Sequence, residues 1–95
     1  MLAEALMCLA LNVYHEAKNQ SLIGQIAVAQ VVMNRVKDER YPDTACEVVK
    51  QAQTYSWKPD LPIKNKCQFS WYCDGKSDKP KDGFAWEQAI TVAHG

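Results

Sequence analysis

The fold is decided by residues 2–36, which read LAEALMCLALNVYHEAKNQSLIGQIAVAQVVMNRV. In the first half of this stretch, apolar side chains recur at spacings of three and four, which is the pattern of an amphipathic helix. We therefore expect a helix over Leu2–Ala17. Its buried stripe is expected to consist of Leu2, Leu6, Leu9 and Val13.

A second helix is expected to begin after Ser21, which suits the N-cap position, and to run to about Val36. Its interior is apolar on nearly every side. Because a helix of this kind has no polar face to turn toward water, we expect it in the middle of the core.

Two further helices are expected from their N-terminal signals. Thr44 and Glu47 form a capping-box pattern, which predicts a short helix over residues 45–51. Asp82 can cap a last helix that ends at Gly95. The chain is therefore expected to be mostly helical.

Residues 52–81 lack the helical pattern and contain three prolines and several lysines. We expect loops here with one short hairpin, since Gln68–Tyr72 suits a strand and Asp74-Gly75 is a strong turn pair. No repeat or linker divides the chain. The predicted fold is mainly α (α+β): one domain over residues 1–95 with an irregular aromatic arm.

Composition limits the classes of partner. Ninety-five residues can build one small core, and 11 basic residues balance 11 acidic ones. This neutral charge favours neither nucleic acid nor an anionic membrane surface as a partner. The longest apolar run near the start is far shorter than a membrane span, and the first residues lack the pattern of a signal peptide.

The cysteines and histidines are the residues that could form cross-links or bind a metal. Four cysteines allow one or two disulfides in an oxidising compartment, with three possible full pairings, or free buried thiols. The only histidines are His15 and His94, and no spacing typical of a zinc site is present. We expect no metal and no cofactor.

Glu16 is the candidate catalytic residue. At 100° per residue it lies at the edge of the apolar stripe, so we expect its carboxyl group to be partly desolvated, as a general acid requires. The alternative is that Glu16 ends the helix at the surface or pairs with Lys18 or Arg35. His15 points about 100° away and is expected to form a structural hydrogen bond.

An aromatic cluster at residues 68–72 is the candidate sugar-binding element. Aromatic rings stack on the C–H faces of sugars, while amides and hydroxyls bind the sugar hydroxyls, and Gln68, Ser70, Trp71 and Tyr72 supply both kinds of group. The alternative is that Phe69 and Trp71 fill the core. Asp74, Asp78 and Asp82 are expected in a solvated turn region.

Three blocks of the sequence together resemble one family of enzymes. They are LALNVYHEA at residues 9–17, GQIAVAQVVMNRV at residues 24–36 and CQFSWYCDGK at residues 67–76. In this order they are similar to the SleB/CwlJ type of cell wall hydrolase. The resemblance implies a lysozyme-like domain that acts on peptidoglycan outside the cytoplasm: in the periplasm, in a spore cortex or after phage lysis.

The resemblance matches Glu16 of the YHEA motif to the family's catalytic glutamate. Two departures are present: residues 18–20 read KNQ where the family often has an Arg-Gly-Glu-like triplet, and the family domain commonly continues beyond a position such as Gly95. The chain is thus expected to be a short version or to be truncated there.

The expected activity is cleavage of the bond between N-acetylmuramic acid and N-acetylglucosamine in peptidoglycan glycan strands. We expect a lytic transglycosylase, because a single glutamate can act in turn as acid and base. The alternatives are an N-acetylmuramoyl-L-alanine amidase and a non-catalytic peptidoglycan-binding module. The residues assigned to substrate binding are Tyr14, Gln68, Ser70, Trp71 and Tyr72.

Overall fold

The structure is a computed structural model that describes residues 2–95, with the side chains of all of them except Leu2, Ala3, Tyr55, Pro59 and Asp60. It contains four α-helices, a two-stranded antiparallel sheet and one 3₁₀ turn among these residues. In chain order the elements are α1 (Leu2–Ala17), α2 (Leu22–Val36), α3 (Ala45–Val49), β1 (Ala52–Tyr55), β2 (Lys58–Cys67), η1 (Ser70–Cys73) and α4 (Gly83–His94). The mainly α (α+β) prediction is confirmed.

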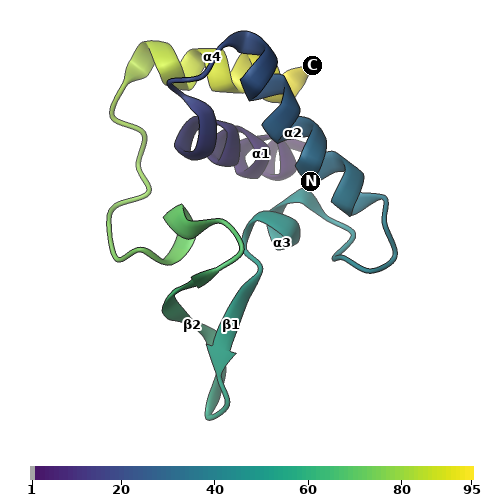
Figure 1. The fold of residues 1–95 in the computed structure, drawn as a ribbon, viewed down its shortest axis with the longest axis vertical. Helices are drawn as coiled ribbons and strands as arrows, with labels where there is room; N and C mark the ends of the chain where they lie inside the picture. Colours follow the sequence, from purple (N-terminus) through teal and green to yellow (C-terminus); the bar gives the residue numbers. More distant parts are fainter. Residues whose placement is uncertain (1) are drawn as a thin grey trace.

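Helix α1 is the central element of the helical body, and α2, α3 and α4 all pack against it (Figure 1). Of the predicted stripe, Leu9 and Val13 are buried and Leu6 is half-buried, while the side chain of Leu2 lies outside the described part. Ala10 and Ala17 are buried as well. The buried surface of α1 is therefore wider than the stripe predicted.

The prediction that α2 lies in the middle of the core is wrong. Only Gln25, Ala29 and Val32 of this helix are buried. Leu22 and Ile23 are 54% and 80% exposed, because neighbouring elements cover one side of α2 and leave the other side open. Apolar content alone did not distinguish a central helix from a peripheral one.

The predicted helix starts are confirmed by their hydrogen bonds. The Ser21 hydroxyl accepts from the Gly24 N–H at 3.3 Å, and the Thr44 hydroxyl accepts from the Glu47 N–H at 3.2 Å. These bonds satisfy backbone donors that have no partner within the helix. The Asp82 carboxylate caps α4 in the same way; α3 ends at Val49, two residues earlier than expected.

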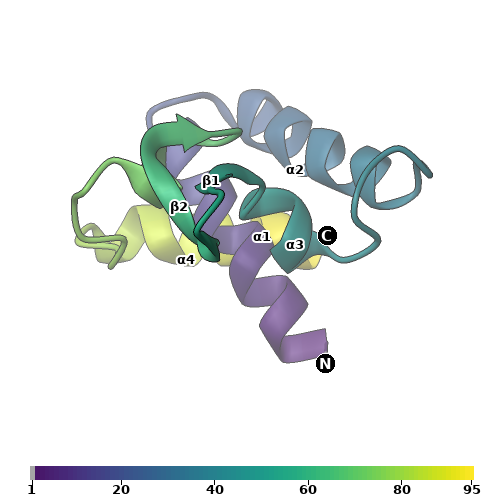
Figure 2. The same ribbon diagram turned by 90° about the horizontal axis from the view of Figure 1, so that it is seen from below.

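The hairpin projects from the helical body along the longest axis of the molecule (Figures 1 and 2). Its ten-residue strand β2 pairs with the four-residue β1 through an irregular register. Thr54 is opposite Pro62, which has no N–H to donate, and Asn65 adopts a left-handed φ of 64°. These features bend the long strand over the short one.

The prediction of a strand over Gln68–Tyr72 is wrong, because Ser70–Cys73 form the 3₁₀ turn η1. A disulfide joins Cys67 to Cys73, and this short loop cannot be closed by an extended strand. The hairpin expected in this region is instead formed by β1 and β2. A second disulfide joins Cys8 of α1 to Cys46 of α3, so all four cysteines are paired.

Candidate functional site

The last turn of α1 carries three adjacent polar side chains with different environments. Tyr14 is buried, and its hydroxyl oxygen accepts hydrogen bonds from the N–H groups of Asp82 at 3.0 Å and Lys81 at 3.1 Å. These bonds, with a contribution from nearby Lys18, lower the pKa of Tyr14. Tyr14 therefore holds the start of α4 against the end of α1.

His15 forms the structural hydrogen bond that was predicted. Its Nε2 atom donates to the backbone carbonyl of Asp78 at 2.8 Å, since a carbonyl can only accept. Its ring stacks on that of Trp71, with the centroids 4.7 Å apart and the planes 17° from parallel. His15 thus joins two segments that are more than 50 residues away in sequence.

Trp71 packs against α1. Its exposure is 7%, and its Nε1 atom donates to Asn12 Oδ1 at 2.8 Å. Phe69 is buried too, as the core-filling alternative predicted. Trp71 is therefore buried beneath the surface of this segment. Gln68 and Ser70 are exposed there, and Tyr72 is half-buried.

Glu16 is exposed, so the expected partial desolvation of its carboxyl group is wrong for the protein on its own. The reason is its position: α1 ends one residue later, and residues 18–20, which follow the helix, are exposed as well. The carboxylate forms no hydrogen bond or ion pair with any residue that the structure describes. Lys18 lies over the Tyr14 ring, and Arg35 lies over the rings of Tyr41 and Phe69.

Asp78 is a second carboxyl group near the end of α1, and it is half-buried, whereas a solvated turn region was expected for it. Burial raises its pKa, nearby His15 opposes this shift, and Asp74 adds to it. No local pattern predicts this environment, because His15, which binds the Asp78 backbone carbonyl, is 63 residues away in the chain.

A polar hollow of about 430 Å³ lies at the base of the hairpin. Of the predicted binding residues, only Gln68 lines it, and its backbone N–H donates to the Gln51 carbonyl at 2.9 Å. Sequence reasoning missed the other members, because strand pairing between β1 and β2 brings them together. The lining consists of Gln51, Ala52, Gln53, Lys66, Cys67 and Gln68.

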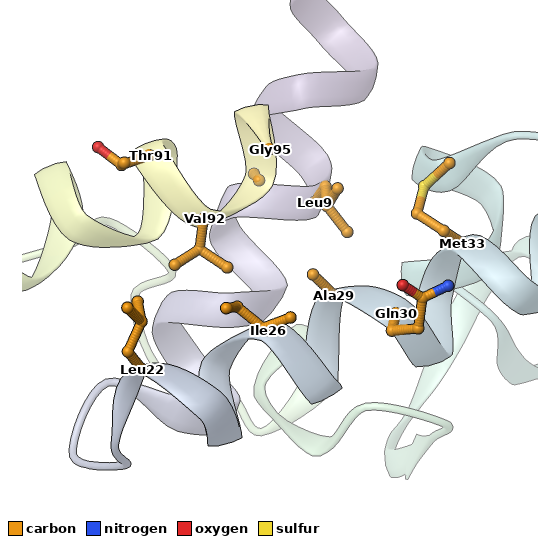
Figure 3. A pocket seen from close by; sticks show the side chains of 10 residues that line it. Leu9, Leu22, Ile26, Ala29, Gln30, Met33, Thr91, Val92 and Gly95 are labelled. Carbon is orange, nitrogen blue, oxygen red and sulfur yellow. The ribbon is translucent and has the colours of Figure 1, made fainter.

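An apolar hollow of about 430 Å³ lies between α2, α4 and α1 (Figure 3). Leu22, Ile26 and Val92 point toward one another across it. None of the residues predicted to act on substrate lines this hollow.

The described part of the chain contains neither a cluster of metal ligands nor a helix that could span a membrane. Among the side chains that the structure describes, no three of His, Cys, Asp or Glu are grouped so that they could hold a metal ion. None of the helices in residues 2–95 is both long and apolar enough to cross a membrane.

Comparison with known proteins identifies the family. The family model described as Cell Wall Hydrolase matches residues 19–95, which include α2, α3, the hairpin and α4. The match begins three residues after Glu16 and so does not cover it. A search of curated proteins and a search of solved structures each found no significant match. Because the family model spans most of the sequence, the chain belongs to the SleB-type cell wall hydrolase family of enzymes that act on the bacterial cell wall.

Proposed function

We propose that the protein is a lytic transglycosylase that cleaves the glycosidic bond between N-acetylmuramic acid and N-acetylglucosamine, with Glu16 as its general acid and base. The observation that carries this proposal is the state of Glu16. It is an exposed carboxylate without a partner among the described residues, on the last turn of the helix that lies at the centre of the fold.

The surroundings of Glu16 support this role. Its two predecessors are fixed by hydrogen bonds, Tyr14 to the start of α4 and His15 to Asp78. A rigid backbone at this point places the carboxylate in a defined position, which proton transfer to a bound substrate requires. A glycan strand lying over Glu16 would displace water from it, and desolvation favours the protonated carboxyl group that a general acid needs.

The proposed reaction uses one carboxyl group twice. Glu16 donates its proton to the glycosidic oxygen, and the bond between this oxygen and C1 of the muramoyl residue breaks. The resulting carboxylate then takes the proton from the C6 hydroxyl of the same residue, and the C6 oxygen bonds to C1. A 1,6-anhydro ring forms, no water is consumed, and Glu16 regains its proton.

The test is the Glu16→Gln variant with purified peptidoglycan. Because glutamine cannot transfer the proton, we expect the release of soluble fragments to fall by roughly 10²–10⁴-fold. Glu4→Gln is the matched control, since Glu4 is an exposed glutamate on the same helix. Unchanged release by Glu16→Gln, with wild-type melting temperature, would show that the acid is elsewhere.

Mass spectrometry of the products separates the alternative reactions. Anhydro-muramoyl ends support the transglycosylase, reducing ends indicate a muramidase, and freed stem peptides indicate an amidase. Binding to sacculi without any cleavage would instead support a non-catalytic module. Tyr14, Gln68, Ser70, Trp71 and Tyr72 remain the residues proposed to shape the substrate surface, with Tyr14 and Trp71 acting from buried positions.

A muramidase is the second candidate, and the environment of Asp78 favours it. Hydrolysis with water generally requires two carboxyl groups, one of them protonated. Asp78 is a carboxyl group whose burial raises its pKa, and its backbone contacts the residue that precedes Glu16. A loss of reducing-end products in Asp78→Asn, comparable with that in Glu16→Gln, would favour hydrolysis over transglycosylation.

A further inference from the structure

The hairpin and the residues that flank it carry a concentrated positive charge. Residues 50–68, here named the arm, contain four lysines and one aspartate, a formal charge of +3 in a chain whose total is zero. All four lysines are exposed, and none forms an ion pair with a side chain that the structure describes. They are Lys50, Lys58, Lys64 and Lys66.

The polar hollow at the base of the arm contains amides and one of these lysines, without any carboxylate in its lining. Three glutamines, Gln51, Gln53 and Gln68, contribute amide groups, and Lys66 contributes an ammonium group. The Gln51 Oε1 atom is buried and has no hydrogen-bond partner among the described residues. A buried acceptor without a donor destabilises a protein by about 1–3 kcal/mol, so a turn of this amide toward a bound N–H group in the hollow would be favourable.

These observations together specify the chemistry of a ligand. The exposed lysines attract anionic groups, the amides of the hollow match peptide or acetamido groups, and the unpaired Gln51 oxygen requires an N–H donor. A stem peptide of peptidoglycan offers N–H groups and carboxylates on one short chain. A phosphate polymer offers the negative charge but no N–H donor.

We propose that the arm binds the stem peptides of peptidoglycan, with Lys66 attracting a stem carboxylate and Gln51 accepting an N–H group in the polar hollow. This inference rests on the proposed action on peptidoglycan, and it assigns to the arm a binding role separate from the chemistry at Glu16. Since the lysines are exposed, the attraction is screened by salt, with a Debye length of about 8 Å at physiological ionic strength.

The binding experiment uses the Glu16→Gln chain, so that cleavage does not remove the ligand, and measures the fraction that sediments with sacculi. Adding Lys66→Gln should weaken binding roughly fivefold at low salt, which is the effect of losing one exposed ion pair. Adding Gln51→Leu should weaken binding at every salt concentration, because it removes a neutral hydrogen bond. Lys37→Gln, the same charge change on an exposed lysine after α2, is the matched control and should bind as before.

Chemical changes to the sacculi identify the ligand. Conversion of the stem carboxylates to amides should weaken binding and abolish the difference between Lys66→Gln and its parent. Removal of phosphate polymers should leave binding unchanged. If phosphate removal abolishes binding while amidation does not, or if Lys66→Gln and Gln51→Leu both bind like Lys37→Gln, the inference is overturned.

Binding and cleavage are measured separately, so stem binding by the arm and the activity of Glu16 are tested independently. If the enzyme with Glu16 intact cuts peptidoglycan and Lys66→Gln changes neither KM nor binding, the arm has no role in recognising stems and the chemistry at Glu16 stands. If carboxylate-dependent binding is found and no bond is cut, the arm binds stems and the proposed activity is wrong. A rise in KM without a change in kcat for Lys66→Gln supports both.

Discussion

Helices α1 and α2 are similar in length and apolar content, but α1 lies in the centre of the helical body and α2 at its periphery. Each of the two contacts the other three helices, but on α1 the side chains of Val13 and Ala10 are completely buried. Helix α2 leaves Ile23 80% exposed and Ile26 49% exposed. The difference shows that the extent to which neighbouring elements surround a helix decides which apolar helix becomes central, and sequence periodicity does not report this extent.

The disulfide between α1 and α3 is expected to have the largest effect on the stability that the central helix α1 provides. Cys8 and Cys46 are 38 residues apart, so their cross-link removes much of the freedom of the unfolded chain. The double variant Cys8→Ala/Cys46→Ala should lose about 4 kcal/mol in free energy of unfolding, measured with urea. Removing Cys67–Cys73, which are six residues apart, is the control and should cost about 2 kcal/mol.

Truncating one apolar residue on each helix is expected to have an intermediate effect on the free energy of unfolding. Val13→Ala removes two carbons from a fully buried site and leaves a cavity, so the free energy of unfolding should fall by about 2–3 kcal/mol. Ile23→Ala removes exposed carbons and should change it by less than about 0.5 kcal/mol. Equal losses in the two variants, measured by chemical denaturation, would mean that the open side of α2 is covered in solution.

The smallest expected effect on stability is its pH dependence, which arises from two carboxyl groups near the ends of the two helices. After α2, hydrogen bonds from Arg40 lower the pKa of Asp38 to about 2. A lowered pKa stabilises the fold above the unfolded value of 3.8, and this stabilisation is lost as the pH falls toward 2. Near the end of α1, burial raises the pKa of Asp78, which has the opposite sign: the fold is destabilised as the pH rises above 3.8, because the carboxyl group then becomes charged in a partly buried position.

The two substitutions should therefore act in opposite directions near neutral pH. Asp38→Asn should lower the melting temperature, and the difference from wild type should disappear as the pH falls toward 2. Asp78→Asn should raise the melting temperature near neutral pH and have no effect below pH 3.8. NMR titration of the two carboxyl groups measures both pKa values directly, and a normal value for Asp78 would contradict its burial.

The helices could be predicted from the sequence because their signals are local. The Ser21, Thr44 and Asp82 caps are all present, and each depends on residues no more than three positions away. The prediction of a strand at Gln68–Tyr72 was wrong, because the Cys67–Cys73 disulfide closes that segment into a turn. The sequence alone did not specify this pairing of cysteines.

The candidate site could be predicted only in part, for the same reason. The hydrogen-bonding role of His15 followed from its helical position, whereas its partner Asp78 is 63 residues away. The burial of Trp71 depends on Asn12, which is 59 residues away, and the polar hollow depends on strand pairing. Glu16 is exposed because other parts of the chain leave the end of α1 uncovered, and the periodicity of the sequence does not encode this.

The covalent and hydrogen-bonded link between the arm and α1 has a consequence for the kinetics of substrate binding. The hairpin is joined to η1 by the Cys67–Cys73 bond, and η1 is fixed to α1 through Trp71, Asn12 and His15. The arm is thus already held against α1 before a glycan strand arrives. Association with a soluble glycan fragment is then expected to follow a single phase whose rate rises linearly with fragment concentration, without the plateau that a slow closing step would impose.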